Sequence, residues 1–331
     1  MSLQTRTLGK TGRAVSEIGL GCWQLGAGWG EVTDDQARTV LHTALDAGVT
    51  LLDTADVYGD GRSERLVGEV VAARGDHDRV TVATKAGRRA DPHVAEAFTR
   101  DALRAWVDRS RANLGVDTLD LLQLHCPPPA VYGDDAVFDV LDELADDGWI
   151  AAYGVSVETT DEAMQAIARE HVATVQLIAN VFRQRPLDEV VPAAHEAGVG
   201  IIVRVPLASG LLSGRYTEST TFASDDHRTF NRDGSAFDVG ETFAGVPFDV
   251  GVDAARSFAR LAPEGVTPAQ VALRFLLDQP GVSTVIPGAR SAEQARGNAA
   301  AAELPPLSSE VHDQLRSLYD ETVRPHVHDR W

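Results

Sequence analysis

Short apolar runs alternate with amphipathic segments along almost the whole 331-residue chain. The runs are apolar throughout rather than alternating in polarity, as expected for parallel strands that are buried on both faces. The eight predicted strands span residues 17–23, 49–55, 78–85, 118–125, 149–156, 172–178, 199–207 and 281–288. Nearly all of them are separated by segments of helical character, which predicts parallel βα units.

The segments between these runs carry helix signals. The first has Thr33 in position to cap its amino end and Gly48 just beyond its last residue, and both are typical helix boundaries. The predicted helices span residues 34–47, 64–73, 97–114, 135–148, 161–170, 187–197, 252–261, 268–278, 291–301 and 308–322. Residues 5–16 are expected to form a hairpin, and residues 208–249 a long loop.

Eight βα units in a chain of this length favour an α/β fold of the closed (β/α)8 TIM-barrel type. An open doubly wound parallel sheet is the alternative. We expect the barrel to carry an N-terminal β-hairpin and additional C-terminal helices. Length alone suggests about two domains, but barrels of this size often form one. Because no linker or repeat interrupts the chain, we expect one domain over residues 1–331.

The composition excludes several classes of partner. A formal net charge of −19 argues against binding to nucleic acid or to an anionic membrane. No apolar run approaches the roughly 20 residues of a membrane-spanning helix, and the first residues lack the apolar core of a signal peptide. The two cysteines, Cys22 and Cys126, are too few for a disulfide framework and lack metal-ligand spacing. We therefore expect a reduced, cytoplasmic protein, and the sequence does not indicate its oligomeric state.

Lysine occurs only at Lys10 and Lys85, whereas arginine is plentiful. An acidic, lysine-poor composition is expected either from a GC-rich genome or from adaptation to a cytoplasm of high salt concentration, where such a surface stays soluble. The sequence favours neither explanation over the other.

Polar and aromatic residues stand at the carboxyl ends of the predicted strands, where barrels of this kind carry their chemistry. They are Trp23, Asp53 with Tyr58, Lys85, His125, Ser156, Gln176, Arg204, and Gly288 with Arg290. Taken singly, Asp53 is equally well explained as a cap, and Tyr58 or His125 as a structural residue. Lys85 is harder to explain in this way. Arginine would serve a surface ion pair, whereas a compact ammonium with a tunable pKa suits a buried position beside a phenol.

Four of these side chains together supply the groups that carbonyl reduction needs: Asp53, Tyr58, Lys85 and His125. A carbonyl that accepts a hydride develops negative charge on its oxygen and must gain a proton. Tyrosine has an unperturbed pKa of about 10, and a nearby ammonium is expected to lower that pKa by favouring the phenolate. A carboxylate holds the ammonium in place, and an imidazole orients or polarises the carbonyl.

The motifs around these residues resemble those of the aldo-keto reductase family, whose members are (β/α)8 barrels that use NADPH. The resemblance rests on LLDTADVYG (51–59) with Glu64, on TVATKAG, LDLLQLH and GVS at the next strand ends, and on VIPGARSAEQARGN near the carboxyl end. It implies that Tyr58 is the general acid and that Lys85 and Asp53 tune it. It also implies that His125 positions the substrate carbonyl, that the cofactor is NADP(H), and that the partner is a small-molecule carbonyl substrate.

The resemblance further implies a set of cofactor-binding residues. They are Ser156, Gln176, Arg204, Pro206, Leu207, Gly288, Arg290, Gln294 and Asn298. Ser156 and Gln176 match residues that hold the nicotinamide amide, but Val157 stands where the family has asparagine. Arg204 stands where the family often has a tyrosine beneath the nicotinamide ring, and a planar guanidinium is able to stack there.

The segment after the last strand departs from the family pattern at one position, because Gly297 replaces the glutamate that commonly precedes Asn298. We expect Arg290 to grip the 2′-phosphate of NADP(H), since a guanidinium binds phosphate through two parallel hydrogen bonds. The alternative is that Arg290 pairs with Glu293 at the start of the helix.

Substrate choice is expected to depend on the loops. The candidate wall residues are Trp23, Trp29, Val57 and Tyr132, together with residues 222–243. The tail, residues 323–331, is expected either to fold over the mouth of the barrel or to fray.

Other kinds of site fit less well. The glycine-rich segment GLGCWQLGAGWG (19–30) nowhere has the G-x-G-x-x-G spacing of a Rossmann-type site. No paired metal ligands stand at the strand ends, so no metal site is expected. A cofactor-binding regulatory or sensor subunit is the alternative to an enzyme, as channel-associated members of the family are, and it would retain the same four polar residues.

Overall fold

Eight parallel strands form a closed barrel in the computed structural model, which describes residues 3–26, 29–30 and 32–331. The strands are β3 (Leu20–Gly21), β4 (Leu51–Asp53), β5 (Thr81–Ala86), β6 (Leu121–His125), β7 (Tyr153–Ser156), β8 (Thr174–Ile178), β9 (Gly200–Arg204) and β10 (Val282–Val285). Each strand pairs in parallel with the next one along the chain. Parallel bridges from Ile18 to Val285 and from Gly21 to Gly288 join the last strand to the first. The predicted barrel is confirmed, and the open sheet is not.

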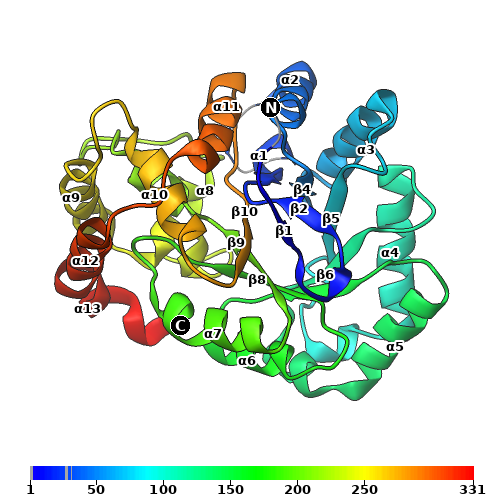
Figure 1. The fold of residues 1–331 in the computed structure, drawn as a ribbon. Coiled ribbons are helices and arrows are strands. Elements are labelled where there is room, and N and C mark those ends of the chain that lie inside the picture. The colour runs from blue at the N-terminus through cyan, green and yellow to red at the C-terminus, as the bar shows by residue number, and fades with distance from the viewer. Residues whose placement is uncertain (1–2, 27–28, 31) are drawn as a thin grey trace.

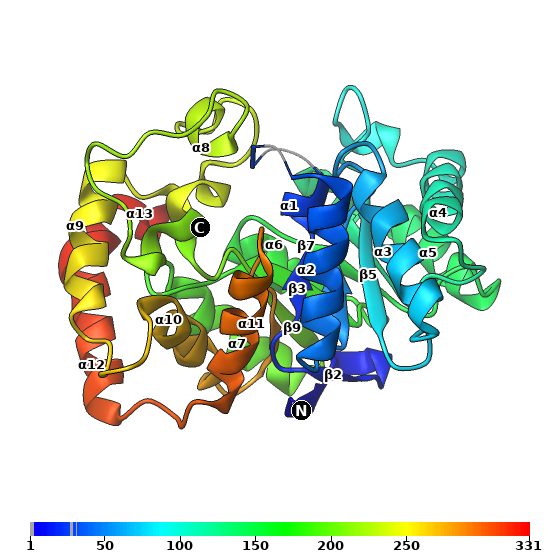
Figure 2. The same cartoon turned by 90° about the horizontal axis from the view of Figure 1, so that it is seen from above.

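Helices accompany the strands, and most of these helices lie on the outside of the barrel (Figures 1 and 2). They are α1 (Trp23–Gly26), α2 (Asp34–Asp46), α3 (Arg62–Arg74), α4 (Arg100–Leu114), α5 (Asp135–Asp146), α6 (Thr160–Ile167), α7 (Arg185–Glu196), α8 (His227–Phe230), α9 (Phe248–Ala259), α10 (Pro268–Leu277), α11 (Ala292–Ala300), α12 (Ser309–Leu318) and α13 (Arg324–Val327). Local sequence fixes their starts. At α2 the Thr33 hydroxyl accepts from the Gln36 amide N–H, and the Gln36 side chain accepts from that of Thr33, which is a reciprocal capping box.

The predicted hairpin packs against one end of the barrel. Its strands β1 (Thr5–Thr7) and β2 (Ala14–Ser16) pair antiparallel. Its apolar side chains lie in a buried cluster with strand residues, and the cluster comprises Leu8, Val15, Leu51, Ala83, Leu121, Ile202 and Ile286. Gly200, the first residue of β9, permits this close approach because a side chain there would collide with the backbone of Gly9. The opposite mouth, at the carboxyl ends of the strands, carries the polar residues.

Several boundaries differ from the predictions for local reasons. β3 covers only part of residues 17–23, because Trp23 already begins α1. β9 stops at Arg204, since Val205 has a φ of 52° and leaves the extended conformation. Residues 208–249 are not an unstructured loop but contain α8 and three short 3-10 helices.

The carboxyl-terminal tail packs against the protein rather than fraying. Trp331 is 4% exposed, and its ring lies 3.7 Å from the guanidinium carbon of Arg183, in the segment after β8. The same indole lies next to Gly240 and Gly245, where an added side chain would collide with it. The tail therefore packs against residues 240–245, which belong to the long segment of residues 208–249.

Candidate active site

A polar layer lies inside the barrel between β4, β5, β6 and β8. Lys85 Nζ donates hydrogen bonds to Asp53 Oδ1 and, at 2.9 Å, to the carbonyl oxygen of Thr54. The second oxygen of Asp53 accepts from the side-chain amides of Gln123 at 3.1 Å and Gln176 at 2.7 Å. The side chains of Lys85 and Asp53 are only 1% and 4% exposed. Their charges are therefore paired, hydrogen-bonded and fixed in position.

Tyr58 lies beside this pair, in the segment that joins β4 to α3. Its hydroxyl oxygen is 3.4 Å from Lys85 Nζ. Its ring stacks on Trp23 with 6.0 Å between centroids and meets His125 edge-on at 5.9 Å. The structure thus brings together the four side chains predicted from the strand ends.

The pKa of Tyr58 is raised rather than lowered. Burial raises this pKa most, the Lys85 ammonium acts in the opposite direction, and Asp53 raises it again. The expected direction is wrong for the net shift because burial of the phenol outweighs the effect of the Lys85 ammonium, with Asp53 adding to the increase. Burial lowers the pKa of Lys85 itself, but Asp53 and Tyr58 more than reverse this effect. At neutral pH Tyr58 therefore keeps its proton and Lys85 its charge.

His125 ends β6 and is 4% exposed. Burial, followed by the charges of Arg88 and Lys85, holds its pKa well below the usual range, so the imidazole is neutral. Its Nδ1 atom is buried and has no hydrogen-bond partner within the described ranges. The neutral imidazole thus lies edge-on beside the Tyr58 ring.

Aromatic side chains from distant segments meet beside Tyr58. Trp23 and Trp29 lie edge to face at 5.5 Å. His227 of α8 lies 4.9 Å from Trp23 and 4.3 Å from Trp29, and Phe237 lies 5.8 Å from Trp23. The two tryptophans were predicted as wall residues. Residues 222–243 were named only as a range, because no motif or periodicity in that segment shows which side chain faces the barrel.

The predicted nicotinamide residues lie at the ends of β7 and β8. Ser156 is paired in register with Gln176, and its hydroxyl oxygen is 3.7 Å from Cys126 Sγ. The amide nitrogen of Gln176 is occupied by Asp53, so Gln176 also belongs to the polar layer. Val157 offers no side-chain amide, but its carbonyl accepts from Arg204 Nη2 at 3.0 Å.

Arg204 belongs to a buried ion-pair cluster. Its Nη1 lies 3.5 Å from Glu241 Oε1, and Arg88 Nη1 lies 3.1 Å from the same oxygen. Arg88 Nη2 lies 2.9 Å from Glu158 Oε1. Ligand atoms of Cys126, Glu158 and Glu241 lie within 4.8 Å of one another, which is close enough to hold a metal ion. However, both carboxylates pair with arginine, and burial raises the pKa of Cys126 to about 11, so we interpret the cluster as an ion-pair network.

Sequence reasoning missed three members of this cluster. Arg88 lies three residues after Lys85, and Glu158 lies two residues after Ser156. Both therefore follow strand ends, those of β5 and β7, and could have been recognised from the sequence by this position. Glu241 had no such signal, because it comes from within residues 208–249.

The predicted residues after β10 gather at the start of α11. Asn298 Nδ2 donates to the carbonyl of Gly288 at 3.2 Å, and Gln294 Oε1 accepts from the backbone N–H of Arg290 at 2.7 Å. Arg290 is exposed, and its guanidinium would be 3.4 Å from a Cβ atom built at Gly30. Arg290 thus lies between the amino end of α11 and the segment after β3.

The remaining predicted residues occupy two places. Val57 is half-buried beside Tyr58, whereas Tyr132 is 2% exposed, and burial, followed by the charge of Glu162, raises the pKa of its hydroxyl. Pro206 and Leu207 follow β9 and lead into two residues with left-handed backbone, Ala208 and Ser209, with φ of 47° and 53°.

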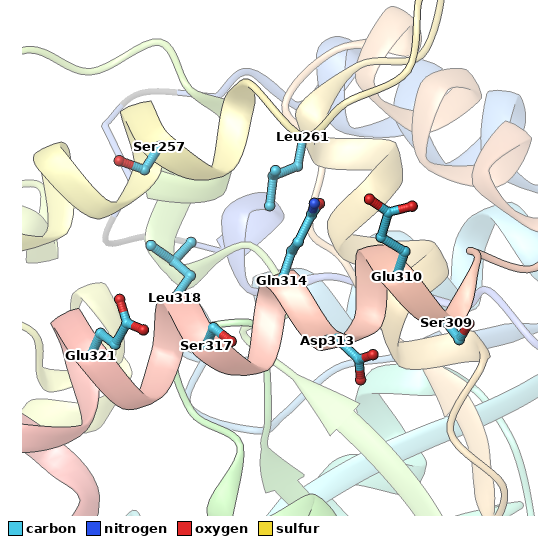
Figure 3. Close-up of a pocket in the computed structure, with 9 residues that line it drawn as sticks. All are labelled: Ser257, Leu261, Ser309, Glu310, Asp313, Gln314, Ser317, Leu318 and Glu321. Atoms are coloured by element: carbon cyan, nitrogen blue, oxygen red, sulfur yellow. The ribbon is translucent and has the colours of Figure 1, made fainter.

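A groove of about 510 Å³ lies away from this site, between α9 and α12 (Figure 3). Leu261 and Leu318 provide its apolar surface, and Glu310, Asp313 and Glu321 provide acidic groups. None of the predicted catalytic or cofactor residues lines it. Separately, none of the helices in the described ranges has both the length and the apolarity to cross a membrane.

Comparisons with known proteins identify a family and its solved structures as similar to this chain. Residues 17–320 match the model of the Aldo/keto reductase family. The chain is 33% identical to Aldo-keto reductase YhdN of Bacillus subtilis, over 97% of this chain and 95% of that protein. A glycerol dehydrogenase structure from Gluconobacter oxydans gives a TM-score of 0.78 at 28% identity, covering 99% of this chain and 97% of its own. An aldo-keto reductase of Klebsiella pneumoniae in complex with NADPH gives 0.69 at 27% identity, covering 96% of both chains.

Proposed function

As the chain belongs to the aldo-keto reductase family, we propose that it reduces an aldehyde or ketone with NADPH and that Tyr58 donates the proton. The observation that carries this proposal is the contact of the Tyr58 hydroxyl with a buried ammonium, 3.4 Å away, that is itself paired with Asp53. A phenol in this position keeps its proton at neutral pH and has a cation beside it when the proton leaves.

The side chains then have distinct tasks. NADPH, when bound, supplies the hydride. The neutral imidazole of His125 donates a hydrogen bond that orients the substrate carbonyl. Tyr58 transfers its proton to the carbonyl oxygen, and Lys85 stabilises the phenolate that forms. Asp53 holds Lys85 in place, and solvent restores the proton of Tyr58.

The residues at the mouth fit an NADP(H) molecule. Arg204 has a buried Nε atom without a hydrogen-bond partner among the described residues, and its planar guanidinium is suited to stack on a nicotinamide ring. Ser156 and Gln176 would hold the nicotinamide amide. Arg290, just before α11, would bind the 2′-phosphate, because backbone N–H groups at a helix start also favour an anion.

The substrate is a small carbonyl compound that fits against the aromatic residues beside Tyr58. The wall of Trp23, Trp29, His227 and Phe237 suits an apolar or sugar-like molecule. Both cysteines are free and buried, in keeping with a reduced, cytoplasmic protein.

The test is steady-state oxidation of NADPH with a panel of aldehydes and ketones, with the alcohol product identified. We expect turnover with several members of the panel. If the protein binds NADPH tightly but turns over none of them, the regulatory or sensor function replaces the enzymatic one. If it binds neither NADPH nor NADH, the cofactor assignment is wrong.

A further inference from the structure

The carboxylate of Glu241 enters the barrel mouth from outside the βα framework. Glu241 lies in the long segment between β9 and α9, and its side chain is 7% exposed. One oxygen of this carboxylate faces two guanidinium groups, at 3.1 Å from Arg88 and 3.5 Å from Arg204. A buried charge of this kind is stable only when it is paired, so Glu241 and the two arginines depend on one another.

The backbone holds this carboxylate in one position. The Ser209 hydroxyl donates to the carbonyl oxygen of Glu241 at 3.0 Å and accepts from the Phe243 N–H at 3.1 Å. Ser209, Phe243 and Ala244 all have left-handed backbone, with φ between 53° and 56°. Left-handed backbone at residues other than glycine costs free energy and persists only where the surroundings enforce it. The segment that presents Glu241 is therefore preorganised.

Arg204 is held from two sides. Glu241 contacts one end of its guanidinium, and the Val157 carbonyl accepts a hydrogen bond from the other end. Burial alone lowers the pKa of Arg204, but Glu241 contributes most to the opposing increase. The plane of Arg204 is thus held by Val157 and Glu241 together, and its charge is balanced chiefly by Glu241, a residue that the barrel itself does not supply.

We propose that Glu241 is a positioning residue for the cofactor. It fixes Arg204 beneath the nicotinamide and cancels its charge, and it thereby sets the relative affinity for the oxidised and reduced forms. This inference rests on the proposed function, because it takes Arg204 to lie at the nicotinamide ring. The physical reason is that only the oxidised ring carries a positive charge. An uncompensated guanidinium beside it repels NADP⁺ and leaves the neutral ring of NADPH nearly unaffected, and the buried setting strengthens this repulsion.

The test measures the dissociation constants of NADP⁺ and NADPH by fluorescence titration of the whole protein, without substrate. In Glu241→Gln, which retains the side chain's shape, we expect the ratio of Kd for NADP⁺ to Kd for NADPH to rise roughly tenfold, or about 1.4 kcal/mol. For a two-electron couple this raises the potential of the bound cofactor by about 30 mV. A merely structural role would weaken both forms equally and leave the ratio unchanged.

Three further variants distinguish the proposed role from others. Arg204→Gln should move the ratio in the opposite direction, and the double variant Arg204→Gln/Glu241→Gln should restore it to near the wild-type value. Glu158→Gln alters the other carboxylate of the cluster, which pairs with Arg88 rather than Arg204 and whose pKa burial raises to about 7, so a much smaller change is expected.

The outcomes are separable from those that test the proposed function. If wild-type protein binds neither cofactor form, the proposed function fails. If it binds both forms and Glu241→Gln leaves their ratio unchanged, the role of Glu241 is refuted. A shift that persists in the double variant, or is equally large in Glu158→Gln, also refutes it. A thermal melt of each variant confirms that folded proteins are compared.

Discussion

Replacing Tyr58 with phenylalanine separates catalysis from folding in this protein. Among the residues that the structure describes, the hydroxyl has one long contact, 3.4 Å to Lys85 Nζ. In its absence Lys85 still donates to Asp53 and to the Thr54 carbonyl, so no buried charge loses its partner. The phenylalanine ring keeps the stacking on Trp23. Because a normal hydrogen bond contributes about 0.5–1.5 kcal/mol and this one is long, we expect the free energy of unfolding to fall by less than about 1 kcal/mol.

The effect on turnover is expected to be far larger. Tyr58→Phe removes the only group that we assign to donate the proton, and general acid catalysis contributes about 10²–10⁴-fold. We therefore expect kcat to fall by at least about 10²-fold while the Kd for NADPH changes by less than about threefold, which is less than about 0.7 kcal/mol. The neutral His125 would not compensate, because burial holds its pKa far below the usual range.

The assay combines three measurements on the same preparation: steady-state NADPH oxidation, fluorescence titration with NADPH, and urea unfolding. Trp106→Phe serves as a matched control, because it alters an aromatic side chain of α4 that packs on Phe98, away from the polar layer. A Tyr58→Phe protein that retains more than about a tenth of wild-type kcat would refute the assignment of Tyr58 as proton donor. Loss of NADPH binding would mean that the substitution acts through the cofactor site instead.

Three further predictions concern single features of the molecule. Arg290→Ala is expected to raise the Kd for NADPH about 10- to 150-fold, equivalent to a charge-assisted contact of about 1.5–3 kcal/mol. The Kd for NADH should stay nearly the same. If fluorescence titrations show both cofactors weakened equally, the 2′-phosphate is bound elsewhere. Both carboxylate oxygens of Asp56 are buried without a hydrogen-bond partner in the described ranges, and burial, with Glu64 second, raises its pKa from 3.8 to about 7. The folded state therefore favours the protonated acid, and stability should fall as pH rises through this interval. In urea unfolding, Asp56→Asn should reduce this loss of stability with pH and raise the free energy of unfolding by up to about 4 kcal/mol at about pH 8. An unchanged pH dependence would contradict this account. Finally, screening of the net charge of −19 should raise the melting temperature between low and molar KCl, whereas a constant value would favour the GC-rich explanation of the composition.

The barrel was predictable because its signals are local and repeated. Continuous apolar runs identify buried parallel strands, and residues such as Thr33 identify helix starts. The boundaries were less predictable where tertiary contacts override local preference. Val205 takes a left-handed conformation that nothing in the run VGIIVRVPL indicates, so the predicted strand continued too far.

The meeting of the candidate catalytic residues was predictable for a related reason. Parallel strands that enter one barrel must end at one mouth, so residues at strand ends are neighbours whatever their separation in sequence. This argument brought Asp53, Lys85 and His125 together without coordinates. It does not extend to His227 and Glu241, because the path of residues 208–249 depends on packing against the mouth rather than on a repeated pattern. The direction of the net shift in the pKa of Tyr58 was also not predictable from the sequence, because it depends on how deeply the ring is buried.

The raised pKa of Tyr58 and the ammonium beside it act at different stages of the proposed reaction. Before hydride transfer, burial keeps the phenol protonated, so the acid is present at neutral pH. During transfer, the proton leaves and a phenolate forms 3.4 Å from Lys85 Nζ, where the cation stabilises it. Asp53 prevents Lys85 from losing its charge on burial. A lysine without Asp53 would risk neutralisation by burial, and Asp53 without Lys85 would only raise the phenol's pKa further. The three side chains therefore act as one unit. Asp53 allows Lys85 to stay charged while it is buried, and that charge stabilises Tyr58 only when the phenol loses its proton.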